Sequence, residues 1–99
     1  MSTQLIFHEK KITKEADIIE IKIWRVPKTS EFPEGIKYSL IFIHGFTRVL
    51  GYDNEHGKGH HKHVYDIESK IHFKNWRDLI KRFRNEVNQL RSELYGSKS

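Results

Sequence analysis

Hydrophobic residues alternate with polar ones through most of the first 67 residues, with a period of two. Such alternation, rich in β-branched residues, predicts strands whose side chains point in turn to opposite faces of a sheet. Pro27 ends the second run, because proline cannot donate a hydrogen bond to a neighbouring strand. Short polar or glycine-containing segments separate the runs and predict turns. Five strands are predicted, at residues 4–11, 18–26, 36–44, 47–52 and 60–67.

From Asn75 onward the hydrophobic residues recur at steps of three and four, which predicts one amphipathic helix. Asn75 can cap its amino end, and Asp78 lies in the first turn, where the helix dipole favours an acidic residue. Gly96 is placed to end the helix. The apolar stripe consists of Trp76, Leu79, Ile80, Phe83, Val87, Leu90 and Leu94.

The predicted fold class is α+β: an antiparallel sheet of about five strands with one long C-terminal amphipathic helix packed on one face. At 99 residues the chain suits a single domain over residues 1–99, with strands at about 4–67 and the helix at about 75–95. Residues 36–44 are apolar on both faces, which predicts a central strand. The helix can cover one of these faces and a second subunit the other, so a homodimer is also considered.

The composition excludes several classes of protein. There is no cysteine, so disulfide scaffolds, thiolate zinc sites and thiol catalysis are ruled out. The longest apolar run spans only residues 40–43, and the amino terminus lacks the features of a secretion signal. We therefore expect no membrane association and a cytoplasmic protein.

The chain is basic, with a formal net charge of +5 when the histidines are neutral. A positive field favours phosphate polymers or an acidic protein partner. On the predicted helix, basic residues follow one another along one flank, where they could track a phosphate backbone or form an ordinary solvated surface. This basic flank consists of Lys74, Arg77, Lys81, Arg84 and Arg91.

Histidines are concentrated in the segment GYDNEHGKGHHKHV, residues 51–64, where four of the seven in the chain fall within eight positions. On a strand, side chains two residues apart share a face. His61, His63 and Tyr65 are therefore predicted to point the same way.

Three interpretations of this segment remain open. His61 and His63 could bind a divalent metal with a third group such as His56, His60 or Asp53. They could instead act as general acid and base in metal-free cleavage of RNA at the ribose 2′-hydroxyl. The third interpretation is an exposed hairpin without a function.

Metal-free cleavage also needs a cation to hold the phosphate, and Lys58, Lys62 and Arg48 are candidates. Gly57 and Gly59 flank Lys58 and would let main-chain amides approach an anion.

The other histidines and the strand aromatics have simpler explanations. We expect packing or surface positions for the isolated histidines, and core or dimer contacts for the aromatics in preference to base stacking. These residues are His8, His44, His72, Trp24, Tyr38 and Phe42.

The strings IWRVP at 23–27, IKYSLIFIHG at 36–45 and GYDNEHGKGHHKHV at 51–64, followed by one amphipathic helix, resemble the TumE-like toxin family. Members are small bacterial and archaeal proteins, usually encoded beside a helix-turn-helix antitoxin. The resemblance covers nearly the whole chain, and its most specific part is Y-D-N-x-x-G-K-G-x-H-x-H. That pattern falls on Tyr52, Asp53, Asn54, Gly57, Lys58, Gly59, His61 and His63.

The resemblance implies the toxin of a type II toxin–antitoxin pair, with a helix-turn-helix antitoxin as partner. RNA as a second partner is an analogy with other small toxins that have a sheet and basic residues. In the reaction considered, His61 and His63 share the acid–base work, Lys58 stabilises the phosphorane, and Tyr52 or Asp53 orients a histidine. Arg48, Lys62 and the basic flank would bind the nucleic acid. No cofactor is needed for this reaction, although a divalent metal at His61 and His63 would make it a metal-dependent nuclease. The alternative is a non-enzymatic module that binds nucleic acid or the antitoxin and adjusts transcription.

Overall fold

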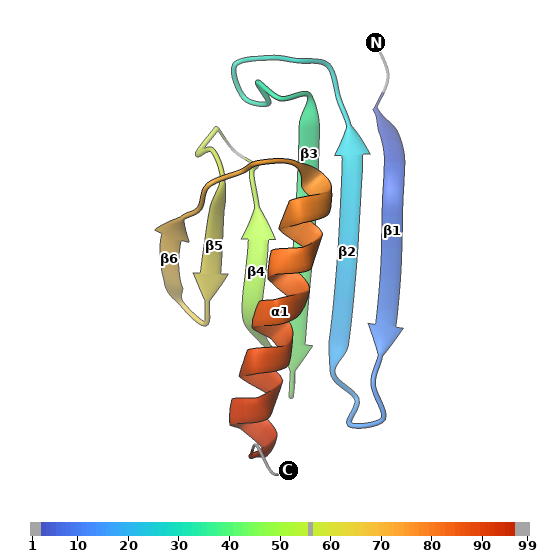
Figure 1. Ribbon diagram of the computed structural model, residues 1–99, viewed down its shortest axis with the longest axis vertical. Helices are drawn as coiled ribbons and strands as arrows, with labels where there is room; N and C mark the ends of the chain where they lie inside the picture. Colours follow the sequence, from blue (N-terminus) through green and yellow to red (C-terminus); the bar gives the residue numbers. More distant parts are fainter. Residues whose placement is uncertain (1–2, 56, 97–99) are drawn as a thin grey trace.

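Six antiparallel strands form a single sheet in which each strand pairs with the next along the chain, as the computed structural model shows (Figure 1). The structure describes residues 3–55 and 57–96. The strands are β1 (Gln4–Ile12), β2 (Ile18–Arg25), β3 (Ile36–His44), β4 (Thr47–Asp53), β5 (His61–Val64) and β6 (Ile67–Lys70). Short hairpin connections suffice for this topology, because consecutive strands are neighbours in space.

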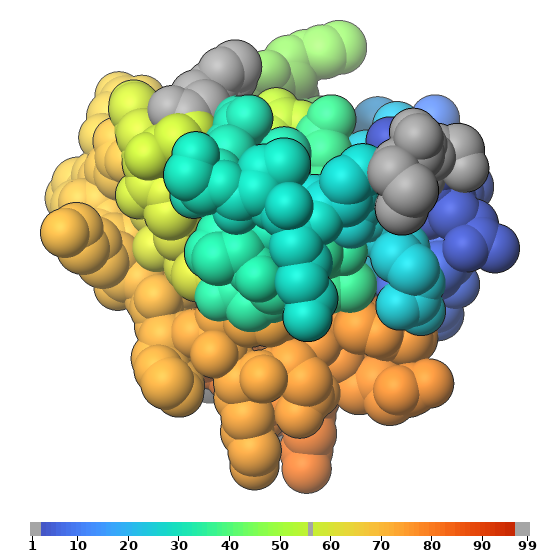
Figure 2. All heavy atoms as spheres, turned by 90° about the horizontal axis from the view of Figure 1, so that it is seen from above, coloured from blue at the N-terminus to red at the C-terminus, as the bar shows by residue number. Residues whose placement is uncertain are grey.

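One helix, α1 (Trp76–Tyr95), follows the sheet and lies along one side of it (Figures 1 and 2). The Asn75 side chain accepts a hydrogen bond from the Asp78 backbone N–H, and Gly96 adopts a positive φ of 76° after the last turn. Both predicted ends of the helix are therefore confirmed. Within the described ranges, no helix is long and apolar enough to cross a membrane.

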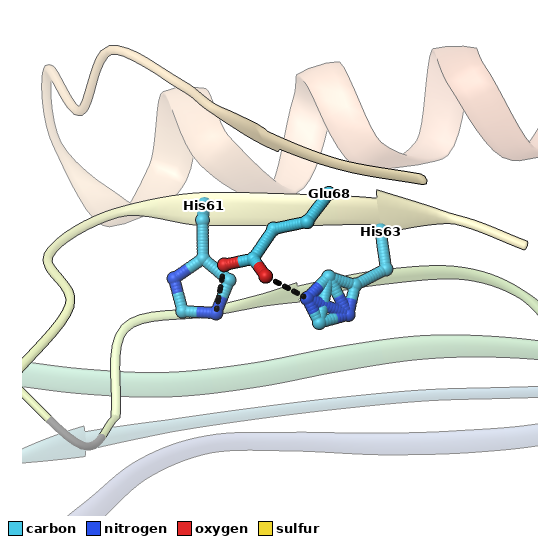
Figure 3. Close-up of side chains that lie close together, drawn as sticks. All are labelled: His61, His63 and Glu68. Atoms are coloured by element: carbon cyan, nitrogen blue, oxygen red, sulfur yellow. Dashed lines mark ion pairs between the residues drawn. The ribbon is translucent and has the colours of Figure 1, made fainter. Parts of the chain in front are cut away.

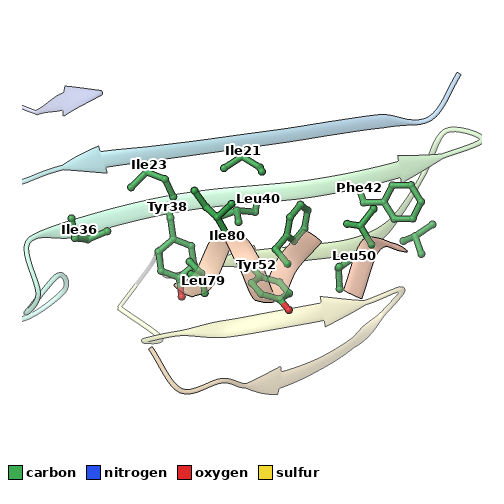
Figure 4. Packing of buried hydrophobic residues seen from close by; sticks show 13 residues of the cluster. Ile21, Ile23, Ile36, Tyr38, Leu40, Phe42, Leu50, Tyr52, Leu79 and Ile80 are labelled. Atoms are coloured by element: carbon green, nitrogen blue, oxygen red, sulfur yellow. The ribbon is translucent and has the colours of Figure 1, made fainter. Parts of the chain in front are cut away.

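The hydrophobic core lies between α1 and the face of β2, β3 and β4 that the helix covers (Figure 4). Tyr38, Leu40 and Phe42 of β3 point into it and are fully buried. Because successive strand residues point to opposite faces, the intervening residues of each strand form a second face. Among the described residues, no element of secondary structure covers this second face, which we call the open face.

The predicted α+β class, with its antiparallel sheet and C-terminal helix, is confirmed, but the prediction of a single fifth strand at residues 60–67 is wrong. Tyr65 and Asp66 form a two-residue turn, so the segment is a hairpin of β5 and β6. Tyr65 has a φ of 53° and lies in this turn, not on the strand face of His61 and His63. The turn lacks the Asn-Gly or Asp-Gly pair that usually marks a two-residue hairpin, so the alternating pattern seemed to continue through it.

A buried carboxylate fastens the last turn of the helix to the sheet. Asp17, only 1% exposed, lies 2.8 Å from Nδ1 of His44 and accepts hydrogen bonds from the Tyr95 hydroxyl at 2.8 and 2.9 Å and from Nε of Arg91 at 3.3 Å. Burial opposes ionisation of Asp17, but the hydrogen bonds from His44, Tyr95 and Arg91 outweigh it and lower the pKa of the carboxyl. The ionised form therefore stabilises the fold.

Replacing Asp17 with asparagine should lower the free energy of unfolding by about 2 kcal/mol at pH 7, the scale of hydrogen bonds to a charged group. A lowered folded-state pKa contributes stability above the ordinary value of 3.8, and this contribution is lost as the pH falls below it. Urea unfolding at pH 7 and pH 3 measures the difference. The difference in free energy of unfolding between wild type and Asp17→Asn should be smaller at pH 3 than at pH 7. An equal difference at both pH values would show that the charge of Asp17 is not responsible.

Candidate functional site

Strands β4, β5 and β6 bring two histidines and two carboxylates together on the open face. Asp53 of β4 pairs with His61 of β5, and His63 pairs with Glu68 of β6. The rings of His61 and His63 point to the same side of β5, with centroids 5.2 Å apart and planes tilted by 37°. The Glu68 carboxylate lies between the two rings (Figure 3).

Both ring nitrogens of His61 have close partners, and the residue is only 4% exposed. Its Nδ1 lies 3.0 Å from the carbonyl oxygen of Gly59, and a carbonyl can only accept, so Nδ1 carries a proton. Its Nε2 lies 2.8 Å from Oδ1 of Asp53 and 3.8 Å from Oε2 of Glu68. The backbone and Asp53 thus fix the ring plane and direct Nε2 toward the carboxylates.

His63 is held by an arginine from the neighbouring strand. Its Nδ1 accepts a hydrogen bond of 2.7 Å from Nη2 of Arg48. Its Nε2 is buried without a hydrogen-bond partner among the described residues, and the closest carboxylate oxygen, Oε1 of Glu68, is 3.6 Å away. Gly51 permits the contact with Arg48, because a Cβ at position 51 would stand 3.2 Å from Cδ of the arginine.

The lysine of the glycine-rich turn lies at the rim of the site. Lys58 lines an open hollow with His61, Glu68, Ser69 and Lys70. Gly57 and Gly59, on either side of it, have φ values of 68° and 76°, in the region that favours glycine. Arg48 thus contacts His63 directly, and Lys58 shares an open hollow with His61.

A buried asparagine anchors the start of this turn. The Asn54 side chain accepts a hydrogen bond of 3.0 Å from the Tyr38 N–H and donates one of 2.8 Å to the Ile36 carbonyl. It is 2% exposed and links the segment after β4 to the beginning of β3. In the Asp-Asn pair of the motif, Asp53 thus contacts a histidine while Asn54 holds the backbone.

His61, His63 and Glu68 could together hold a metal ion, because one ligand atom from each lies within 4.8 Å of the others. A backbone carbonyl on Nδ1 of His61 is the kind of contact that orients histidine ligands. Coordination by Nε2 of His63 would move its proton to Nδ1, where Arg48 now donates, so the arginine would have to leave. Of the third groups considered from the sequence, His56 lies outside the described residues.

Tyr52 and Lys62 lie on the face opposite the histidine pair. The Tyr52 hydroxyl donates to Oε1 of Glu86 on α1, and Lys62 forms an ion pair of 2.8 Å with the same carboxylate. Burial, followed by the bond to Glu86, raises the pKa of Tyr52, so its phenol stays protonated. Of the two residues predicted to orient a histidine, Asp53 contacts His61 and Tyr52 does not.

His60 also lies apart from the pair. Its ring stacks on Phe73 at a centroid distance of 4.6 Å, and its nitrogens contact the Tyr38 hydroxyl at 2.8 Å and Glu34 at 3.1 Å. These contacts make it a packing residue. His60 therefore does not face His61 and His63, with which it was considered as a third metal ligand.

The predicted basic flank of α1 lies on the helix side of the sheet, away from the histidines. Two of its arginines tie the helix to the first hairpin: Arg84 to Glu9 at 2.7 Å and Arg91 to Glu15 at 2.8 Å. Arg77 lies over the ring of Trp76, 4.3 Å from its centroid. Lys74 and Lys81 are exposed. A nucleic acid on this flank would therefore not reach the histidine pair along the same surface.

Glu68 is the site residue that the sequence did not reveal. In a two-residue hairpin, position 63 faces position 68, so recognising the turn at Tyr65 and Asp66 would have placed Glu68 beside His63. Gly51 was also missed as the residue that makes room for Arg48.

Comparison with known proteins identifies the family of this site. No curated protein and no solved structure matches the chain. A family model described as toxin TumE matches residues 3–91, which include every strand, the histidine pair and most of the helix. The chain belongs to the TumE toxin family.

Proposed function

We propose that this chain, as the toxin of a toxin–antitoxin pair, arrests growth by cleaving RNA with His61 and His63. Membership of the TumE toxin family supports the toxin role and implies an antitoxin partner. A helix-turn-helix antitoxin is the form of partner proposed. The RNA target and the reaction are inferred from the chemistry of the open face.

The proposal depends on one observation: two imidazoles lie on one strand face with their ring centroids 5.2 Å apart. Imidazole is suited to proton transfer near neutral pH, and two of them can serve the two ends of one reaction. Arg48 contacts His63, and Lys58 shares a hollow with His61. These cations can bind the phosphate and stabilise charge that develops on it.

The reaction is an internal transfer of the phosphodiester. One histidine accepts the proton of the ribose 2′-hydroxyl as its oxygen forms a bond to phosphorus. The other donates a proton to the 5′-oxygen as the bond from that oxygen to phosphorus breaks. The products are a 2′,3′-cyclic phosphate and a 5′-hydroxyl, and no water, metal or oxidant is consumed.

The Glu68 carboxylate marks where the phosphate would bind. It lies 3.8 Å from Nε2 of His61 and 3.6 Å from Nε2 of His63, the position that a phosphate oxygen needs for contact with both rings. Because its side chain is 44% exposed on the last strand of the sheet, it can swing aside. The bond from Nδ1 to the Gly59 carbonyl then keeps the His61 ring in place.

Changing His61 or His63 to alanine should relieve growth arrest and slow RNA cleavage by the purified protein roughly 10²- to 10⁴-fold, the usual contribution of general acid–base catalysis. His72→Ala is the matched control. His72 is an exposed histidine between β6 and α1, outside the strands that carry the histidine pair. Gel analysis of RNA and growth on induction provide the two measurements.

Toxicity and cleavage that survive the double change His61→Ala, His63→Ala would contradict the proposal. RNA that stays intact with the wild-type protein, but binds it with an affinity that falls steeply with salt, would favour the alternative of a non-enzymatic binding module.

Glu68→Gln separates metal-free from metal-dependent cleavage. If the phosphate replaces the Glu68 carboxylate, removing its negative charge should lower the KM for RNA several-fold, and a chelator should leave the rate unchanged. If Glu68 is a metal ligand, the same change and the chelator should both abolish cleavage. Cleavage rates with and without chelator, for wild type and Glu68→Gln, distinguish the two. Glu93→Gln, at an exposed position of α1, controls for the loss of a surface carboxylate.

A further inference from the structure

One line of paired residues runs across all six strands of the open face and passes through the histidine site. The strand register joins its members directly, so they lie side by side across the sheet. From β1 to β6 they are His8, Lys22, Ser39, Asp53, His61 and Lys70. Neighbouring strands are about 4.8 Å apart, so Lys22 on β2 and His61 on β5 are separated by about 14 Å.

The far end of this line carries an aromatic ring and several cations. Trp24 follows Lys22 at the next position of β2 on the same face, and Lys37 of β3 lies over its ring, 5.1 Å from the centroid. Trp24 is partly exposed and does not belong to the core. Of the core or dimer contacts expected for the strand aromatics, a core position is confirmed for Tyr38 and Phe42 and is wrong for Trp24.

The charge at this end is positive. Two acidic residues lie among these cations: Glu55 forms an ion pair of 3.1 Å with Lys37, and Glu20 contacts His8 and Lys22. The hydrogen bond from His8, followed by the charges of Lys22 and Lys10, lowers the pKa of the Glu20 carboxyl. Lys22 remains 40% exposed, and its ammonium lies 3.9 Å from Glu20. Cations beside an exposed aromatic face are the elements with which proteins bind single-stranded nucleic acid, since phosphates contact the cations and bases stack on the ring.

Small residues lie near the middle of the line. Ser39 of β3 stands between Lys22 and Asp53, and Gly51 of β4 contributes no side chain beside it. The aliphatic part of Arg48 lies over Gly51 and brings its guanidinium toward His63. A chain that crosses β3 and β4 along this line would meet the small side chain of Ser39 and then Asp53, whose carboxylate is 2.8 Å from His61, with the Arg48 guanidinium nearby at His63.

We propose that single-stranded RNA crosses the open face along this line, with a base stacked on Trp24 and phosphates held by Lys22 and Arg48, and so reaches His61 and His63. The inference rests on the proposed RNA-cleaving function and names its substrate as unpaired RNA. A duplex would not present free base faces to Trp24, because its bases are stacked on one another. The basic flank of α1 has no part in it, since that flank lies on the other side of the sheet.

The test is direct binding of a fluorescently labelled single-stranded RNA of about ten nucleotides, within the usual site size for such surfaces. Its 2′-hydroxyls are methylated, so that it cannot be cleaved and binding is read separately from catalysis. Trp24→Leu should weaken binding about tenfold, the effect of losing one stacked base. Lys22→Gln should weaken it several-fold and reduce the salt slope by about 0.7.

Lys81→Gln is the matched control, because it removes the same charge from the exposed flank of α1 and should leave the affinity unchanged. The same RNA in a duplex should bind wild type more weakly. Thermal unfolding verifies that each variant is folded. Equal affinities for Trp24→Leu, Lys22→Gln and wild type, a loss confined to Lys81→Gln, or preference for the duplex would each overturn the proposal. If these variants behave as expected while unmodified RNA stays intact, the binding line stands and the cleavage proposal fails.

Discussion

A single helix covers only one face of a six-stranded sheet, and this asymmetry determines where every other group can lie. Strand alternation sends the large apolar side chains, such as Tyr38, Leu40 and Phe42, beneath the helix. The same alternation places Asp53, His61 and His63 on the opposite face, which no helix covers in residues 3–55 and 57–96. The core and the candidate site thus both follow from strand alternation: alternate residues of the same strands build one or the other.

Local contacts then set the geometry of the histidine pair. Asn54 fixes the backbone after β4, the Gly59 carbonyl fixes one nitrogen of His61, and Gly51 leaves room for Arg48 to reach His63. None of these three residues carries the proposed chemistry. They determine the direction of the rings, which is why the glycine-rich motif and the histidines occur in one short segment.

The helix and most of the sheet could be predicted from the sequence, because the hydrophobic period changes at Asn75 and the first four strands alternate clearly. The turn at Tyr65 could not, since a tyrosine with positive φ gives no compositional signal. Because the turn was not predicted, Glu68 was not assigned to the site. The face of each basic residue was equally hard to predict: Lys62 differs from His61 and His63 by one position, and only the strand register shows that it points to Glu86.

The chemical ends of cleaved RNA test the histidine pair most directly. Transfer to the 2′-oxygen predicts fragments that end in a 2′,3′-cyclic phosphate and begin with a 5′-hydroxyl, and mass spectrometry of the products distinguishes these ends. Fragments with 5′-phosphate and 3′-hydroxyl ends would show that water attacks the phosphorus, as in metal-dependent hydrolysis. That result would contradict acid–base catalysis by His61 and His63.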